Sequence, residues 1–160
     1  MKKQNVSLLA LLLTASVFFA SCHNSANKRA ADALGFDSLR VNQTVHLFGD
    51  TAKPACNLIV NLAYAATPAD STALRDSLNA YLLATCLGHK YVGMAPAEAV
   101  KQYADSYIAK YRELEPLYEQ DEKENAENTG AWYSYYRQVE GHVQLCTDEV
   151  LVYRVDYNEY

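Results

Sequence analysis

Four stretches of this 160-residue chain alternate apolar and polar side chains, and a helical pattern lies between the second and the third. Residues 41–48 and 56–65 are typical of strands, the second with a clear period of two, and turn residues separate them. Residues 133–145 and 151–157 form a second pair, separated by the turn residues Thr147-Asp148-Glu149. We therefore expect two strands before the helical region and two after it.

In the third alternating stretch, most odd-numbered positions are apolar and most even-numbered positions are polar, and we call these two sets its apolar and polar parity. Its apolar parity is interrupted by Arg137 and Gly141, and the last stretch shows an uninterrupted apolar face. The apolar positions of the third stretch are Tyr133, Tyr135, Val139, Val143 and Leu145, and the opposite positions are Trp132, Ser134, Gln138, Glu140 and Gln144. The apolar parity predicts the side of each strand that packs on the core.

The first helix is expected to begin near Thr67, which can cap it, with Pro68 in its first turn. Gly88 is well placed to end it. Its predicted apolar stripe comprises Leu74, Leu78, Tyr81 and Leu82.

A second helix is expected to begin near Pro96, with Glu98 in its first turn, and to kink or end at Pro116. Its stripe comprises Val100, Tyr103, Tyr107, Tyr111, Leu114 and Tyr118. Side chains at this spacing usually pack in a core, and the alternative is a surface for glycans or proteins. The acid-rich residues 113–127 lack the spacing of a calcium loop and predict a solvated helix end that runs into a loop.

This order of elements predicts an α+β fold in which two helices pack on one face of a mostly antiparallel sheet of about four strands. The expected order is strand, strand, helix, helix, strand, strand. We expect one domain over residues 41–160, because a chain of this length builds one core and not two.

The N-terminal region is typical of an exported protein. Two lysines precede the uncharged residues 6–20, a run too short for a comfortable membrane span. The following Phe19-Ala20-Ser21-Cys22 resembles the lipobox of bacterial lipoproteins, which implies lipidation of Cys22 and attachment to the bilayer. We therefore expect a signal peptide over residues 1–21 and a lipidated tether over residues 22–40, with the protein on the periplasmic face of the outer membrane.

Removal of the signal peptide makes the chain more acidic. The two signal-peptide lysines leave with it, so 12 of the 14 basic residues remain against 19 acidic ones. This balance argues against a nucleic acid as partner, because such affinity is built from Lys and Arg contacts to phosphate.

Candidate chemistry is sparse. The sequence contains no phosphate-binding loop, dinucleotide fingerprint, zinc-protease motif or nucleophile elbow, so we expect no enzymatic activity and no cofactor. Cys86, His89, His142 and Cys146 could form a zinc set, but four residues of strand span roughly 13 Å, which argues against convergence. Cys56, Cys86 and Cys146 are predicted to be small buried apolar side chains, with one disulfide as the alternative.

Residues 54–160 resemble the N-terminal module of exported proteins related to the PdaC deacetylase and the RsiV anti-sigma factor. The resemblance is carried by "PACNLIVNLAYA", "LRDSLNAYLLA", the tyrosine-rich helix and "WYSYYRQVEGHVQLCTDEVLVYRVDYNEY". In that family a glycine-rich loop and a companion α/β domain usually follow the module. Because the sequence stops at Tyr160, we expect either a reduced module or a partial reading frame.

The resemblance implies a non-catalytic domain that binds or senses a lysozyme-like protein or a cell-wall ligand. The alternatives are an accessory or substrate-positioning domain of a glycan deacetylase system and a truncated remnant. No catalytic residue is carried over. From the residues themselves, we expect the ligand-binding surface to include Trp132, Tyr136, Tyr107 and Tyr111.

Overall fold

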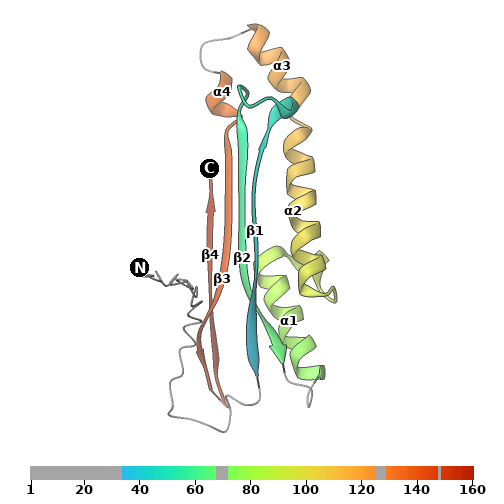
Figure 1. Cartoon of the computed structure of the whole chain (residues 1–160), viewed down its shortest axis with the longest axis vertical. Helices are drawn as coiled ribbons and strands as arrows, with labels where there is room; N and C mark the ends of the chain where they lie inside the picture. Colours follow the sequence, from blue (N-terminus) through green and yellow to red (C-terminus); the bar gives the residue numbers. More distant parts are fainter. Residues whose placement is uncertain (1–33, 68–71, 125–128, 148) are drawn as a thin grey trace, which may run out of the picture.

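The computed structural model describes residues 34–67, 72–124, 129–147 and 149–160. Two strands are followed by helices and then by two more strands, which confirms the predicted order (Figure 1). The strands are β1 (Gly35–His46), β2 (Ala55–Thr67), β3 (Tyr135–Cys146) and β4 (Leu151–Glu159). The helices are α1 (Thr72–Leu87), α2 (Pro96–Arg112), α3 (Glu115–Glu124) and the single turn α4 (Thr129–Trp132), with short 3-10 turns η1 (Leu47–Gly49) and η3 (His89–Tyr91).

The four strands form one sheet in the order β1-β2-β3-β4. β1 pairs with β2 and β3 pairs with β4 in antiparallel fashion, whereas β2 and β3 are parallel, with Val60 opposite Val139. The parallel pair is possible because the helical segment carries the chain back to the start of β3. The α+β class with a mostly antiparallel sheet is therefore confirmed.

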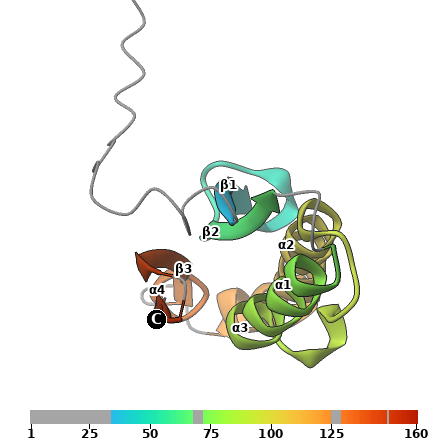
Figure 2. The ribbon, with the colours of Figure 1, turned by 90° about the horizontal axis from the view of Figure 1, so that it is seen from below.

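Helices α1 and α2 lie along one face of the sheet, which we call the covered face, and α3 and α4 lie beyond the end of the strands (Figures 1 and 2). Strand residues on this face lie in or against the core, and the most deeply buried are Leu58, Val60 and Val139 at 0% exposure. The covered face consists of Leu39, Val41 and Val45 on β1, Cys56, Leu58, Val60 and Leu62 on β2, Arg137, Val139 and Gly141 on β3, and Tyr153, Val155 and Tyr157 on β4.

The start and the tyrosine stripe of α2 confirm the sequence prediction. The helix begins at Pro96 with Glu98 in its first turn, and a break after Arg112 separates it from α3, whose first turn contains Pro116. The stripe packs on the sheet: Val100, Tyr103, Tyr111 and Tyr118 are buried, and Tyr107 and Leu114 are partly buried. The core interpretation of the tyrosines was therefore correct.

The predicted stripe of α1 was correct only in part, because Leu82 is buried and Leu78 half-buried while the other two members are exposed. Leu74 and Tyr81 are 59% and 69% exposed, and Thr67 is the last residue of β2 rather than a helix cap. Pro68 lies outside the described residues. The buried residues of α1 are Asn79, Leu82, Leu83, Cys86 and Leu87, so the helix is rotated toward Asn79 and Leu83 relative to the predicted stripe.

Asn79 takes a core position because it completes the hydrogen bonding of β2. Its amide accepts from the backbone N–H of Ala65 at 2.8 Å and donates to the carbonyl of Ala65 at 2.9 Å. The ladder between β2 and β3 ends at Leu62, so a side chain here replaces a strand. A buried backbone amide without such a partner would be costly.

Gly141 and Arg137 interrupt the apolar parity of β3 for two different reasons. A Cβ atom on Gly141 would lie 2.1 Å from the Tyr153 hydroxyl oxygen, so glycine makes room for that ring. The Tyr153 hydroxyl then donates to the carbonyl of Ala63 at 2.8 Å, just beyond the end of the β2–β3 ladder. Arg137 donates from Nε to the hydroxyl of Tyr103 at 3.0 Å.

Two boundaries differ from the prediction. β1 begins at Gly35, so residues 35–40 belong to the sheet and not to the tether. Cys56 and Cys86 are buried free thiols as expected, but Cys146 is exposed because it lies near the β3–β4 turn, beyond the cover of the helices. Among the described residues, no helix has the length and apolar character needed to cross a membrane.

Candidate functional site

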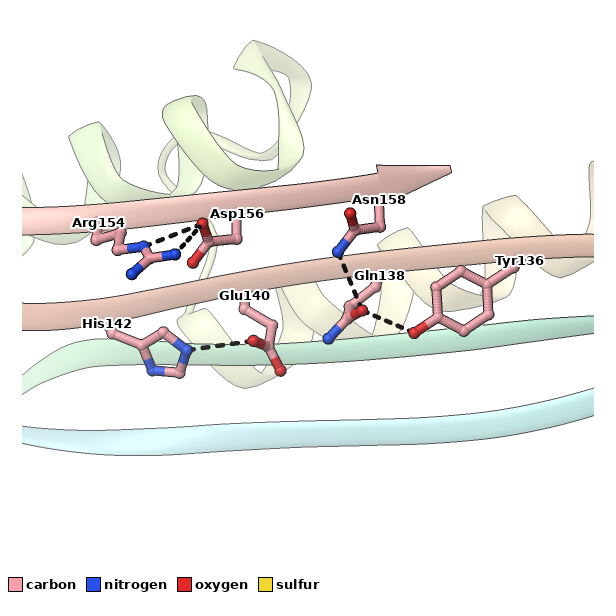
Figure 3. Close-up of polar contacts among 7 residues, drawn as sticks. All are labelled: Tyr136, Gln138, Glu140, His142, Arg154, Asp156 and Asn158. Carbon is pink, nitrogen blue, oxygen red and sulfur yellow. Dashed lines mark hydrogen bonds and ion pairs between the residues drawn. The ribbon is translucent and has the colours of Figure 1, made fainter. Parts of the chain in front are cut away.

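The face of the sheet opposite the helices, which we call the open face, is the candidate site. Strand residues alternate between the two faces, so the positions next to each core residue of β3 point away from the helices (Figures 2 and 3). It comprises Arg40, Asn42 and Thr44 on β1, Asn57, Ile59, Asn61 and Ala63 on β2, Tyr136, Gln138, Glu140 and His142 on β3, and Val152, Arg154, Asp156 and Asn158 on β4, with Tyr160 following. No described residue forms a second layer over this face.

An amide and tyrosine network occupies the end of the open face near the C-terminus. The Tyr136 hydroxyl donates to Oε1 of Gln138 at 2.7 Å, and the Asn158 amide donates to the same oxygen at 3.2 Å (Figure 3). The ring of Tyr160 stacks on Tyr136 with centroids 4.8 Å apart and is 79% exposed. These contacts fix side chains that keep further hydrogen-bonding capacity toward solvent.

A histidine–glutamate contact follows along β3, and an ion pair follows along β4. His142 Nε2 lies 3.5 Å from Glu140, and Arg154 lies 2.8 Å from Asp156 (Figure 3). The hydrogen bond and the charge of Asp156 raise the pKa of Arg154. Because each of these two carboxylates lies beside a basic side chain, the face offers paired donors and acceptors rather than a field of one sign.

Hydrogen-bonding side chains continue onto β1 and β2. The Thr44 hydroxyl donates to Oδ1 of Asn57 at 2.7 Å, and Asn61 lies half-buried on the same face. The polar character therefore extends across all four strands. A flat array of amides, hydroxyls and paired charges suits recognition by many weak polar contacts.

The structure does not bring the four predicted ligand-binding residues together. Tyr136 lies on the open face, whereas Tyr107 and Tyr111 lie on α2 against the covered face. Tyr111 is 3% exposed, and its hydroxyl lies 2.9 and 3.0 Å from the carbonyl oxygens of Pro54 and Tyr133, so it is a core residue. Trp132 is 82% exposed on α4.

Sequence reasoning missed most of the open face. Gln138 and Glu140 were placed only among the polar positions of the third alternating stretch, and Arg154, Asp156 and Asn158 lie opposite the apolar face of the last stretch. That parity is the signal that could have found them, because it predicts which side chains share one side of a sheet. The parity does not predict on which side of the sheet the helices lie. The position of the helices decides whether the polar side is exposed to solvent.

The remaining chemical candidates do not converge. Cys86 lies in the core with Sγ 4.0 Å from the Tyr153 hydroxyl, whereas His142 lies on the open face, so the sheet separates them. His46 donates from Nδ1 to the carbonyl oxygen of Lys53 at 2.9 Å. Within the described ranges, no group of three or more His, Cys, Asp or Glu side chains could hold a metal ion. Cys22 lies outside the described residues.

Comparison with known proteins gives one informative match. No protein-family model matches this chain, and neither does any functionally curated protein. The chain is similar to a solved structure, the crystal structure of a member of the DUF3298 family from Bacteroides fragilis. The sequences are 55% identical, the TM-score is 0.75, and the match covers 80% of this chain.

The match covers 50% of the Bacteroides fragilis chain, so this chain spans about half the length of that protein. At this identity the shared region has the same fold and a closely related sequence. The family name designates a domain of unknown function, so the similarity specifies no ligand or activity.

Proposed function

We propose that this protein is a non-catalytic binding module of the bacterial cell envelope, that a lipid on Cys22 anchors it, and that its ligand binds the open face. The observation that carries the proposal is the polar network of Tyr136, Gln138 and Asn158 on a sheet face that no described residue covers. A module that had to bury this face for its own stability would carry apolar residues there.

The ligand class follows from the chemistry of the face and from the resemblance to PdaC- and RsiV-related modules. Amides and tyrosines recognise both protein backbones and the hydroxyl and acetamido groups of wall glycans. The resemblance to a module that senses lysozyme favours a lysozyme-like protein, with peptidoglycan as the other ligand. The anchor would hold the module on the periplasmic face of the outer membrane, where either ligand is met.

The binding test uses the full chain in detergent with lysozyme and soluble peptidoglycan fragments. We expect Gln138→Ala combined with Asn158→Ala to weaken binding about thirtyfold, since each lost polar contact contributes roughly 1 kcal/mol. The matched control is Gln102→Ala combined with Gln120→Ala, which removes two exposed helix amides that bond only to glutamates one turn away. Equal effects of the two pairs, or no binding of either ligand by the folded chain, would refute the proposal.

The anchor has a separate test. Cys22→Ser should abolish fatty-acid labelling and membrane retention, because lipid chains supply the free energy of attachment. Cys146→Ser is the control, since that exposed thiol is distant in sequence from the signal peptide. Labelling that persists in Cys22→Ser would contradict the lipid anchor without affecting the binding face.

A further inference from the structure

The outer edge of β4 is the least protected part of the sheet. Among the described residues, no strand pairs with β4 on the side away from β3 (Figure 1). Its nine residues contain no proline and no lysine, two of the devices that usually protect an edge. At the opposite edge, α2 runs beside β1, and residues of both elements, including Val41 and Lys101, line a shared groove of about 130 Å³.

We propose that this edge pairs with the same edge of a second copy of the chain, in antiparallel fashion, about a two-fold axis at Val155. Such an interface is isologous, so each residue meets a counterpart by symmetry. The backbone and the charge pattern of β4 both support this register.

The backbone support comes from the direction of the hydrogen-bonding groups. Tyr160 exchanges backbone hydrogen bonds with Tyr136 of β3, at 2.8 and 3.2 Å. Because backbone N–H and C=O groups alternate in direction along an antiparallel strand, those of even-numbered β4 residues point toward β3 and those of odd-numbered residues point outward from the sheet edge. An axis at Val155 pairs Val155 with Val155 of the second copy and Tyr153 with its Tyr157. The outward backbone N–H and C=O groups of the two copies then meet.

The charges select this register among its neighbours. With the axis at Val155, Arg154 lies opposite Asp156 of the second copy, and Asp156 lies opposite its Arg154. An axis at Arg154 or at Asp156 would instead place like charges opposite each other, which is unfavourable. These positions do not exchange hydrogen bonds across the edge, so their Cα atoms would be only about 4.5 Å apart.

Both side chains are available for this contact. They are 63% and 34% exposed, and among the described residues of one chain their side chains bond to each other, two positions apart on β4. In the pair of chains, four charges of alternating sign would meet on the open side of the sheet. The two open faces would then form one surface across eight strands, with the helices of both copies on the other side.

The experiment exchanges charges in the full chain. Two copies with different affinity tags are co-expressed, solubilised in detergent, and measured by co-purification and sedimentation. Arg154→Asp gives a chain with two acids at this edge, and Asp156→Arg gives one with two arginines. We expect each variant to associate with itself about tenfold more weakly than the wild type, because both cross-strand pairs become repulsive.

Mixing the two variants supplies the decisive measurement. An Arg154→Asp chain and an Asp156→Arg chain should associate with each other about as well as wild-type chains do, since every opposing pair is again of opposite sign. Lys101→Asp and Asp105→Lys on α2 alter a comparable exposed ion pair and should leave association unchanged. The proposal is overturned if the folded wild type stays monomeric, if the single variants self-associate normally, or if the mixture fails to associate.

Discussion

Along β3, neighbouring residues face two different environments. Val139 is fully buried against the helices, while Gln138 and Glu140 on either side of it are half-exposed on the open face. On the covered face the polar groups that do occur have specific partners, such as the Tyr153 hydroxyl on the Ala63 carbonyl. On the open face polar groups bond to one another within reach of solvent.

This difference separates what the two faces contribute. Changes on the covered face alter volume and hydrogen bonds that water cannot replace, so they should change the free energy of unfolding by kilocalories per mole. Changes on the open face should cost little stability and act on binding instead. The following predictions test this separation from the largest expected effect on stability to the smallest.

Gly141→Ala should destabilise the protein by about 3 kcal/mol. The new Cβ atom would overlap the Tyr153 ring, and moving the ring away breaks its hydrogen bond to Ala63. The free energy of unfolding in urea measures the effect. Gly130→Ala is the matched control, because a Cβ atom there would meet nothing closer than Pro54 Cγ at 3.9 Å. Equal destabilisation by the two variants would show that the close approach at Gly141 is unimportant.

Asn79→Ala should destabilise the protein by about 2 kcal/mol. It leaves the buried backbone N–H and carbonyl of Ala65 without the amide that now bonds to both. The comparison is Asn61→Ala on the open face. Its free energy of unfolding, measured in the same way in urea, should lie within about 0.5 kcal/mol of that of the wild type. The interpretation of Asn79 fails if its replacement costs no more than that of Asn61.

These residues also show how far the sequence could predict the structure. Alternation predicted the four strands, and the tyrosine stripe placed α2 correctly, because both patterns report burial directly. The phase of α1 could not be predicted in the same way, because Asn79 is polar and its partner at Ala65 is created only by the end of the β2–β3 ladder.

The candidate site depended even more on tertiary structure. The polar parity of β3 and β4 was visible in the sequence, but a polar strand side is also what any solvent-facing sheet shows. The four polar strand sides form one open surface because β2 and β3 are parallel and because α1 and α2, which lie between them in the chain, pack on the opposite face. Tyr107 and Tyr111 were included because a helical stripe does not show which sheet face it packs against.

The reactivity of the three cysteine thiols distinguishes buried from exposed positions. Of the differences between the two faces, this one has the smallest effect on stability near neutral pH. At pH 8 a thiol reagent should modify Cys146 in the folded protein at once, whereas Cys56 and Cys86 should react only after unfolding. Burial raises the pKa of each of these two thiols to about 11. Mass spectrometry of the labelled protein identifies the reacting residues, and rapid labelling of Cys86 would contradict its place in the core.

The same pKa shifts predict how stability responds to alkali. Between about pH 9 and pH 11 the unfolded chain loses the protons of Cys56 and Cys86 while the folded chain keeps them, so the unfolded state binds fewer protons. The free energy of unfolding should therefore be unaffected below pH 8 and fall above pH 9, by roughly 1 kcal/mol per pH unit for each thiol. Cys86→Ala should flatten this decline between pH 9 and pH 10, before the buried tyrosines add to it. Cys146→Ala is the control for this slope, because it removes a thiol that lies outside the core.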